Sequence, residues 1–317
     1  MGALRKDRAV LANAADVRDA VDAALGRGNA VDAVCTGLLV ACARDASVAF
    51  GSVSLLVAGF GMSPRRLDGR VLQPGNLAKR PRGFRDSEVV PSAAYVANPR
   101  LFATVGTALT LAGRATYAAA TAPALAACAD EARKSVLEAF AALGPALFQK
   151  RSIAEELRAA AGPTAGGSLC DDDFTILAPS FFEFPAGSED RFAVPSLAPS
   201  SFEDGAVEWI GARDATGLMC FASFERAKEG HEIPALGLVA PRLALPVRRG
   251  VQRVDPALPL GLLPPVRVAV EGGQLAAIEA LEGPVAALAA FARGGEAMRS
   301  EEARARYVEL EAVRIDR

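Results

Sequence analysis

The string GNAVDA at residues 28–33 opens a run of mostly apolar residues that extends to about Arg44. Gly28 suits the end of one helix. Asn29 suits the N-cap of the next, because its side-chain oxygen accepts hydrogen bonds from free backbone N–H groups. The run that follows is apolar nearly all round, which is typical of a helix buried on every side. The sequence therefore predicts a buried helix over residues 30–44.

On the N-terminal side of this helix, apolar residues over 8–25 recur at helical spacing, which predicts an amphipathic helix. On the other side, the run over 53–60 is typical of a buried strand. The Ala-rich segment 93–160 predicts further helices, interrupted near Pro123 and Gly144 because these residues disfavour a continuous helix. The first part of the chain, residues 1–175, is therefore expected to be rich in helix.

The second part, residues 176–317, is expected to be rich in strand. Pro and aromatic residues are frequent at its start, and short β-like runs follow. The expected elements are a short helix over 282–291 and strands over 207–210, 218–221 and 266–270. Helices followed mainly by strands fit an α+β layered domain better than an alternating βαβ array.

The composition excludes several classes of function. Lys and Arg number 35 and Asp and Glu 37, and the net charge of −2 argues against a nucleic-acid binder, which needs surplus cations on one face. Hydrophobic residues make up 51% of the chain and can form a large core. His231 is the only histidine, which excludes a multi-histidine zinc site. We expect no metal and no cofactor.

The sequence shows no targeting signal and no membrane-spanning segment. The N-terminus has no apolar run of signal-peptide length, and no apolar stretch reaches the about 18 residues that a membrane span requires. The five cysteines form no CxxC pair and suit reduced, buried positions. With the strong bias towards Arg and Ala, these features favour a cytoplasmic bacterial protein that does not contact a membrane.

Several strings, from residue 26 to about 285, resemble the γ-glutamyltransferase family and occur in the family's order. The resemblance begins at 28–33. Its further matches are Asp68-Gly69-Arg70 with Pro74, Gly166-Gly167 with Asp172-Asp173-Phe174, and Pro259-Leu260 with Pro265. It implies one domain over 1–317 with an N-terminal-nucleophile (Ntn) hydrolase-like αββα sandwich, in which stacked sheets lie between helical layers. It also implies glutathione-type γ-glutamyl compounds as the substrates of active members.

The nucleophile position of this family falls on a valine. Active members cut their own chain before a Thr, whose free α-amine then activates its hydroxyl for acyl transfer. The resemblance places Val207 there, with Asp214 and Gly217 following as in the family motif. Valine has no nucleophilic atom, so the resemblance implies a degenerate site that neither cleaves the chain nor transfers an acyl group.

Other parts of the implied site are altered too. Gly261 and Leu262 stand where a pair of serines is expected, and the segment 237–245 offers no acid to hold a substrate amine. Gly272 and Gly273 match a family glycine pair that stabilises an oxyanion. A tight turn between two strands explains these two glycines more simply.

Arg70 is the one implied binding residue that survives. It matches the family arginine that holds the α-carboxylate of the glutamyl group, a role that suits a planar guanidinium fork. The alternative is a surface arginine, because five further arginines lie between residues 65 and 85.

The remaining candidate groups have structural explanations. The acidic run 171–173 suits a loop or a helix cap better than a metal site. His231 suits a loop, since the second histidine of a metalloprotease pair is missing. The basic run 80–85 suits a solvated loop or a contact with an acidic partner. No base can be placed beside the other candidate nucleophiles, which are Ser201, Ser223 and Cys220.

Three hypotheses remain open. In the first, the chain is a catalytically inactive γ-glutamyltransferase-like protein that serves as a binding or structural subunit, either in a homo-oligomer or with an active homologue. In the second, it is an active amide hydrolase or transferase with a different nucleophile. In the third, it is a sensor in which Arg70 holds a small carboxylate.

Overall fold

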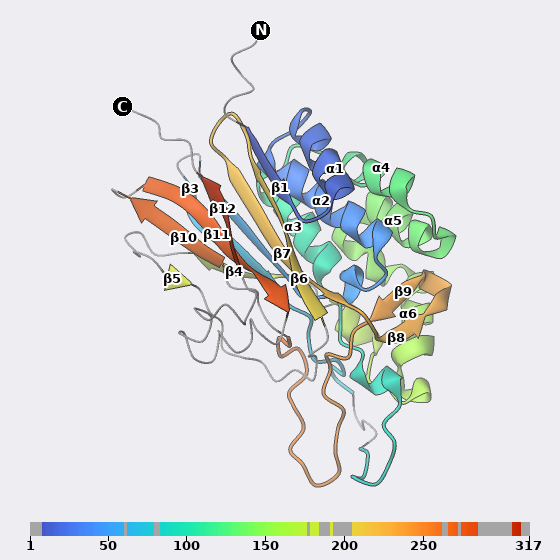
Figure 1. Cartoon of the computed structure of the whole chain (residues 1–317). Coiled ribbons are helices and arrows are strands. Elements are labelled where there is room, and N and C mark those ends of the chain that lie inside the picture. Colours follow the sequence, from blue (N-terminus) through green and yellow to red (C-terminus); the bar gives the residue numbers. More distant parts are fainter. Residues whose placement is uncertain are drawn as a thin grey trace.

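The computed structural model describes residues 8–59, 62–78, 83–175, 178–183, 191–192, 205–261, 266–271, 274–284 and 306–311. All structural statements below concern these residues. Helices and antiparallel strands form separate layers, with the helices gathered on one face of a sheet (Figure 1). The six α-helices of the described part are α1 Ala15–Leu25, α2 Ala30–Arg44, α3 Leu101–Ala112, α4 Tyr117–Ala127, α5 Glu131–Leu143 and α6 Arg151–Ala161.

The buried helix predicted over residues 30–44 is α2. The Asn29 side chain accepts hydrogen bonds from the backbone N–H groups of Val31 and Asp32, and the Asp32 carboxylate accepts one from the Asn29 N–H at 2.9 Å. Every residue from Ala30 to Ala43 is buried. The helix begins at a reciprocal cap and packs between the sheet and the other helices, as its composition predicts.

The main sheet is antiparallel throughout. Its strand order is β4-β3-β2-β7-β6-β11-β10-β5, with β1 also paired with β6 and β12 with β11, and a separate hairpin joins β8 and β9. The strands are β1 Ala9–Ala12, β2 Val53–Gly59, β3 Met62–Gly69, β4 Ser180–Glu183, β5 Arg191–Phe192, β6 Gly205–Arg213, β7 Met219–Ala227, β8 His231–Ile233, β9 Leu238–Ala240, β10 Val266–Glu271, β11 Gln274–Pro284 and β12 Arg306–Glu311.

The sheet divides at one edge of β6. The end of β6 pairs with β1, from Ile210 to Arg213, while its start at Ala206 and Val207 pairs with β11. From there β11 leads away with β10 and β12, and these strands lie on the side of the main sheet opposite to the helices (Figure 1). The architecture is α+β, as predicted. The described helices form one layer, and the second helical layer of the predicted sandwich is not seen among the described residues.

Three predicted elements differ from the structure. The segment 8–25 is not one helix, because Ala9–Ala12 forms the edge strand β1 before α1 begins. Pro123 lies inside α4 without ending it, since α4 is held by its contacts with α2 and α5. Residues 282–284, expected to start a helix, still belong to β11, where Gly283 and Pro284 pair with β6.

Among the described residues, no helix is long and apolar enough to cross a membrane.

Candidate functional site

Alternate residues of the central strands face opposite sides of the sheet. Val53, Leu55 and Val57 of β2 join the hydrophobic core beneath the helices. Ser54 therefore faces the other side, towards the layer that contains β10 and β11. This second side, which we call the inner face, is unusually polar for a buried surface, and it is where the predicted site residues lie.

Two rows of side chains cross the inner face at one end of the sheet. In the first row, Asp68, Ser54, Ser223 and Trp209 are successive cross-strand partners on β3, β2, β7 and β6. Cross-strand partners in an antiparallel sheet point to the same face. All four side chains are buried.

The second row lies two residues closer to the sheet end, so its side chains point to the same face. Val207 of β6 pairs with Glu225 of β7, and the Glu225 N–H donates to the Ser52 carbonyl at 2.9 Å. Arg70 follows directly, because Gly69 pairs with Val53. With about 4.8 Å between neighbouring strands, the backbones of Arg70 and Val207 lie roughly 14 Å apart. The structure thus places both predicted residues on one row, three strands apart.

Gly261 lies next to this row, although it belongs to a segment far from β3 in the sequence. The Leu260 N–H donates to the Val71 carbonyl at 2.8 Å, and Leu72 and Pro259 form an antiparallel bridge, so Gly261 lies beside Arg70. A Cβ atom on Gly261 would lie 2.6 Å from Ser52 Oγ and 3.5 Å from Glu225 Oε2. Two positions that the resemblance singled out, Arg70 and Gly261, are therefore neighbours.

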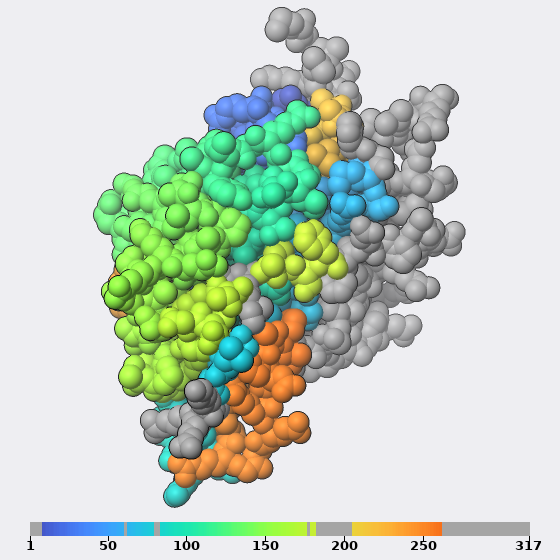
Figure 2. Space-filling model, turned by 180° about the vertical axis from the view of Figure 1, so that it is seen from behind, coloured from blue at the N-terminus to red at the C-terminus, as the bar shows by residue number. Residues whose placement is uncertain are grey.

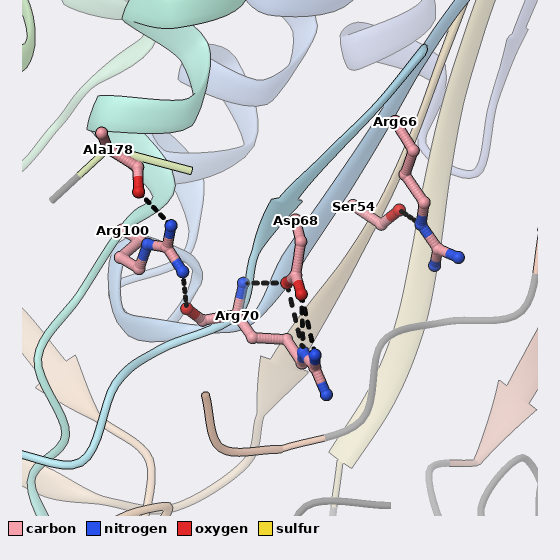
Figure 3. Close-up of polar contacts among 6 residues, drawn as sticks. All are labelled: Ser54, Arg66, Asp68, Arg70, Arg100 and Ala178. Carbon is pink, nitrogen blue, oxygen red and sulfur yellow. Dashed lines mark hydrogen bonds and ion pairs between the residues drawn. The ribbon is translucent and has the colours of Figure 1, made fainter. Parts of the chain in front are cut away.

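A buried ion pair occupies most of the Arg70 fork. Asp68 accepts hydrogen bonds from Arg70 Nε at 3.1 Å, from Arg70 Nη2 at 2.8 Å and from the Arg70 backbone N–H at 3.0 Å. Both side chains are buried. The remaining guanidinium nitrogen, Nη1, points away from Asp68 (Figure 3). Arg70 is neither a free surface arginine nor a fully available carboxylate fork.

Two further arginines surround the same carboxylate. Arg66 Nε donates to Ser54 Oγ at 2.9 Å, and burial lowers the pKa of Arg66 to about 10, an effect that Asp68 partly offsets. Arg100 donates to the carbonyls of Arg70 and Ala178 (Figure 3), and burial also lowers its pKa. Asp68 is thus the buried anion around which three cationic side chains are arranged.

The inner face also holds polar groups without protein partners. Ser52 Oγ and Ser223 Oγ are buried and have no hydrogen-bond partner within the described part of the chain. The Glu225 side chain is buried beside Ser52, with its Oε2 atom 3.3 Å from the Ser52 N–H that donates to it. Because burying a polar group without a partner is costly, such hydroxyls are expected to bind water or a ligand.

Val207 has no means of acting as a nucleophile. Its side chain is a buried hydrocarbon, and its backbone lies within β6 rather than at a chain start. Gly205 and Ala206, the two preceding residues, already pair with Ala227 and Arg226 of β7. An α-amine that could serve as a base would require cleavage of this paired strand.

Two of the predicted site positions cannot be placed. Leu262 and the glycine pair Gly272-Gly273 lie outside the described residues. The flanking residues Glu271 and Gln274 pair across the β10–β11 hairpin, as expected for a turn between two strands.

The other sequence candidates have structural roles. The Asp173 carboxylate accepts hydrogen bonds from the backbone N–H groups of Gly75, Asn76 and Cys170, which ties two loops together. Burial raises the pKa of the Cys220 thiol, which argues against a reactive thiolate there. Ser201 lies outside the described residues. No group of three or more His, Cys, Asp or Glu side chains in the described part could hold a metal ion.

His231 lies in β8, not in a loop. Its Nε2 faces the Ala160 carbonyl at 2.9 Å, and its Nδ1 is 2.8 Å from Ser92 Oγ. Because a carbonyl can only accept, Nε2 carries the proton, and in the neutral ring Nδ1 accepts from the serine hydroxyl. The only histidine thus fastens the β8–β9 hairpin to α6.

Sequence reasoning missed Asp68, Ser52 and Glu225 as members of one site. In the sequence, Asp68 stands out only as part of the string Asp68-Gly69-Arg70. The usable signal is the polar alternation in otherwise apolar strands, such as Ser54 between Leu55 and Val53 or Glu225 after Phe224. Only the strand order shows that these polar positions meet on one face.

The fold defined by these layers is Ntn-hydrolase-like. The chain is similar to the crystal structure of cephalosporin acylase from Bacillus halodurans, with a TM-score of 0.66 over 88% of this chain and 77% of that one, at 12% identity. It is also similar to the structure described as LmbA2991T421A, with a TM-score of 0.64 over 87% of this chain and 78% of that one, at 13% identity.

At the level of sequence, no family model and no curated protein matches the chain. At these low identities the structural likeness establishes the fold and leaves the activity open. The γ-glutamyltransferase resemblance therefore remains an interpretation of short matching strings within an Ntn-hydrolase-like fold.

Proposed function

We propose that this chain is a γ-glutamyltransferase-like protein without catalytic activity, which acts as a binding or structural subunit. The observation that carries the proposal is the hydrocarbon side chain of Val207, which is buried inside β6 at the position where the resemblance implies a Thr. An Ntn-type acyl transfer needs a hydroxyl or thiol and a free α-amine on the same residue, and Val207 supplies no such nucleophile.

Gly261 supports the same proposal. The resemblance implies a serine here, but the backbone has φ +79°, a left-handed conformation that favours glycine, and any Cβ would collide with Ser52 Oγ. A serine cannot be restored without moving Ser52. The site therefore differs from the implied family site at Gly261 as well as at the nucleophile position Val207.

An assay with a γ-glutamyl anilide tests this proposal. We expect the purified chain to release no aromatic amine above the background rate, because the implied nucleophile position is occupied by Val207. Val207→Ala serves as the matched control and should give the same background. Amine release that is abolished by substitution of another residue would contradict the proposal and favour an active hydrolase with a different nucleophile.

A second candidate function is the binding of a small carboxylate. Arg70 Nη1 points away from Asp68, and the Ser52 and Ser223 hydroxyls of the same face have no partner among the described residues. A carboxylate could accept from Nη1 and from one hydroxyl without displacing Asp68. The Asp68 pair limits such a ligand to one guanidinium nitrogen, which favours modest affinity.

Thermal unfolding with added glutamate or glutathione tests this second candidate. If either ligand binds, a concentration of a hundred times Kd should raise Tm by about 5 °C or more, since ligand binding stabilises the folded state by mass action. The shift should be lost in Arg70→Lys, which removes the outward-pointing nitrogen, and kept in Arg85→Lys, an exposed arginine. An equal shift in Arg70→Lys would exclude this role of Arg70.

A further inference from the structure

The Arg70 side chain and backbone together form a site for one carboxylate. Arg70 Nε, Arg70 Nη2 and the Arg70 backbone N–H all donate to the carboxylate of Asp68, over distances of 2.8–3.1 Å. A guanidinium that donates through two nitrogens to one carboxylate forms a strong and directional pair. Both side chains are buried, and the nearby charges of Arg66 and Arg100 act on the same carboxylate.

The backbone around these donors is held in place. Gly69 packs so closely against helix α3 and strand β2 that a Cβ atom would lie 2.3 Å from Thr104 Oγ1 and 2.5 Å from Val53 Cγ1. The Arg70 carbonyl accepts a hydrogen bond from Arg100 (Figure 3). The donors are therefore positioned by the fold, and they would keep their places for a different carboxylate.

The carboxylate in this site comes from the same strand. Asp68 lies in β3 and Arg70 directly follows it, so the two side chains point to the same face. The Arg70 guanidinium consequently lies beside Asp68 (Figure 3). A tethered group competes as if it were highly concentrated, so a free carboxylate at ordinary concentration does not displace it.

The site lies one strand away from the surface. Among the described strands, β4 is the edge strand beside β3, and its residue Ser180 pairs with Asp68. Ala178 and Ser180 are exposed, and the yellow-green segment that contains β4 lies at the surface in Figure 2. A small ion that enters beside β4 does not have to cross the hydrophobic core, which lies on the other face of the sheet.

We propose that the Asp68 carboxylate is an internal ligand, which occupies a carboxylate-binding site at Arg70 and keeps it closed to other carboxylates. The contact is autoinhibitory, because it leaves only Arg70 Nη1 for an external ligand. A chain without the Asp68 carboxylate should gain a complete site for a small monocarboxylate. This inference rests on neither proposed function, since it concerns only the donors that Asp68 now holds.

Chemical rescue of truncated variants tests the proposal. Asp68→Ala removes a carboxylate with the heavy atoms of formate, so formate should fit the vacated space. We expect about 100 mM sodium formate to raise the Tm of Asp68→Ala by about 5 °C or more above its value in sodium chloride of equal concentration. The formate concentration that gives half of the effect should be at least about tenfold higher for the native chain, where the tethered carboxylate competes.

The size of the anion provides a second arm. Acetate carries a methyl group that would collide with the alanine Cβ, so acetate should stabilise Asp68→Ala less than formate does. Asp68→Gly lacks this Cβ and should accept acetate as well. Asp68→Asn, whose amide fills the same space, should gain nothing from either anion, and Asp68→Ala/Arg70→Lys should lose the preference for formate.

A carboxylate that only neutralises buried cations would give a different result, because chloride would then stabilise Asp68→Ala as well as formate does. If Asp68→Ala does not fold without formate, its yield on refolding from urea is compared in the two salts and should be higher in formate. Equal behaviour in formate and chloride, whether folded or unfolded, would overturn the proposal. Equal stabilisation of Asp68→Asn and Asp68→Ala by formate would overturn it as well.

Discussion

Replacing Asp68 by Ala is expected to lower the free energy of unfolding by about 3–5 kcal/mol, because it leaves buried cationic side chains without their anion. Asp68 is buried and accepts hydrogen bonds from the Arg70 side chain and backbone. Arg66 and Arg100 lie near enough for Asp68 to raise their pKa values against the effect of burial. No other described carboxylate forms an ion pair with Arg70.

Urea unfolding of the native chain and of Asp68→Ala measures this effect. The exposed Asp255→Ala is the matched control and should change the free energy of unfolding by less than about 0.5 kcal/mol. A loss below about 1 kcal/mol in Asp68→Ala would show that the three arginines do not depend on this carboxylate.

Replacing Gly167 by Ala is expected to lower the free energy of unfolding by about 3 kcal/mol or more. A Cβ atom there would lie 1.9 Å from the Ala161 carbonyl oxygen and 2.7 Å from the Ala93 carbonyl oxygen. Both obstacles are backbone atoms, which cannot rotate away as a side chain can. The chain turns tightly here, since the Gly167 N–H donates to the Gly162 carbonyl and the Leu169 N–H to the Ala161 carbonyl.

Gly217→Ala separates this steric effect from the general cost of replacing glycine. Gly217 has φ +83° and open space around its Cα, so alanine there meets only the backbone cost of about 1–2 kcal/mol. Thermal unfolding should therefore rank Gly167→Ala well below Gly217→Ala in Tm. Equal Tm values would mean that the turn after α6, which contains Gly167, relaxes to accept a side chain.

The sequence predicts the helical layer well where one signal dominates. The helix over 30–44 was predicted with its N-cap, because Asn29 and an all-round apolar run leave little alternative. The four residues 9–12 fit both the helical and the strand periodicity, and only their pairing with β6 decides between the two. The interruption expected near Pro123 is likewise not found, because the tertiary contacts of α4 outweigh the local preference of proline.

The sequence identifies single residues of the candidate site, but it does not show which residues lie next to one another. Arg70, Gly261 and Val207 were each found through the resemblance, and the structure places them at one end of the sheet. Their partners Asp68, Ser52 and Glu225 could not be assigned, because membership depends on strand order and register.

Intact-mass spectrometry of the purified chain tests the absence of an Ntn nucleophile most directly. The full chain is incubated for days at neutral pH and then analysed under denaturing conditions. We expect a single species of 32.8 kDa, because Val207 cannot attack the preceding peptide bond. Two fragments produced by a break directly before Val207, or before any other residue at the start of β6, would contradict the account.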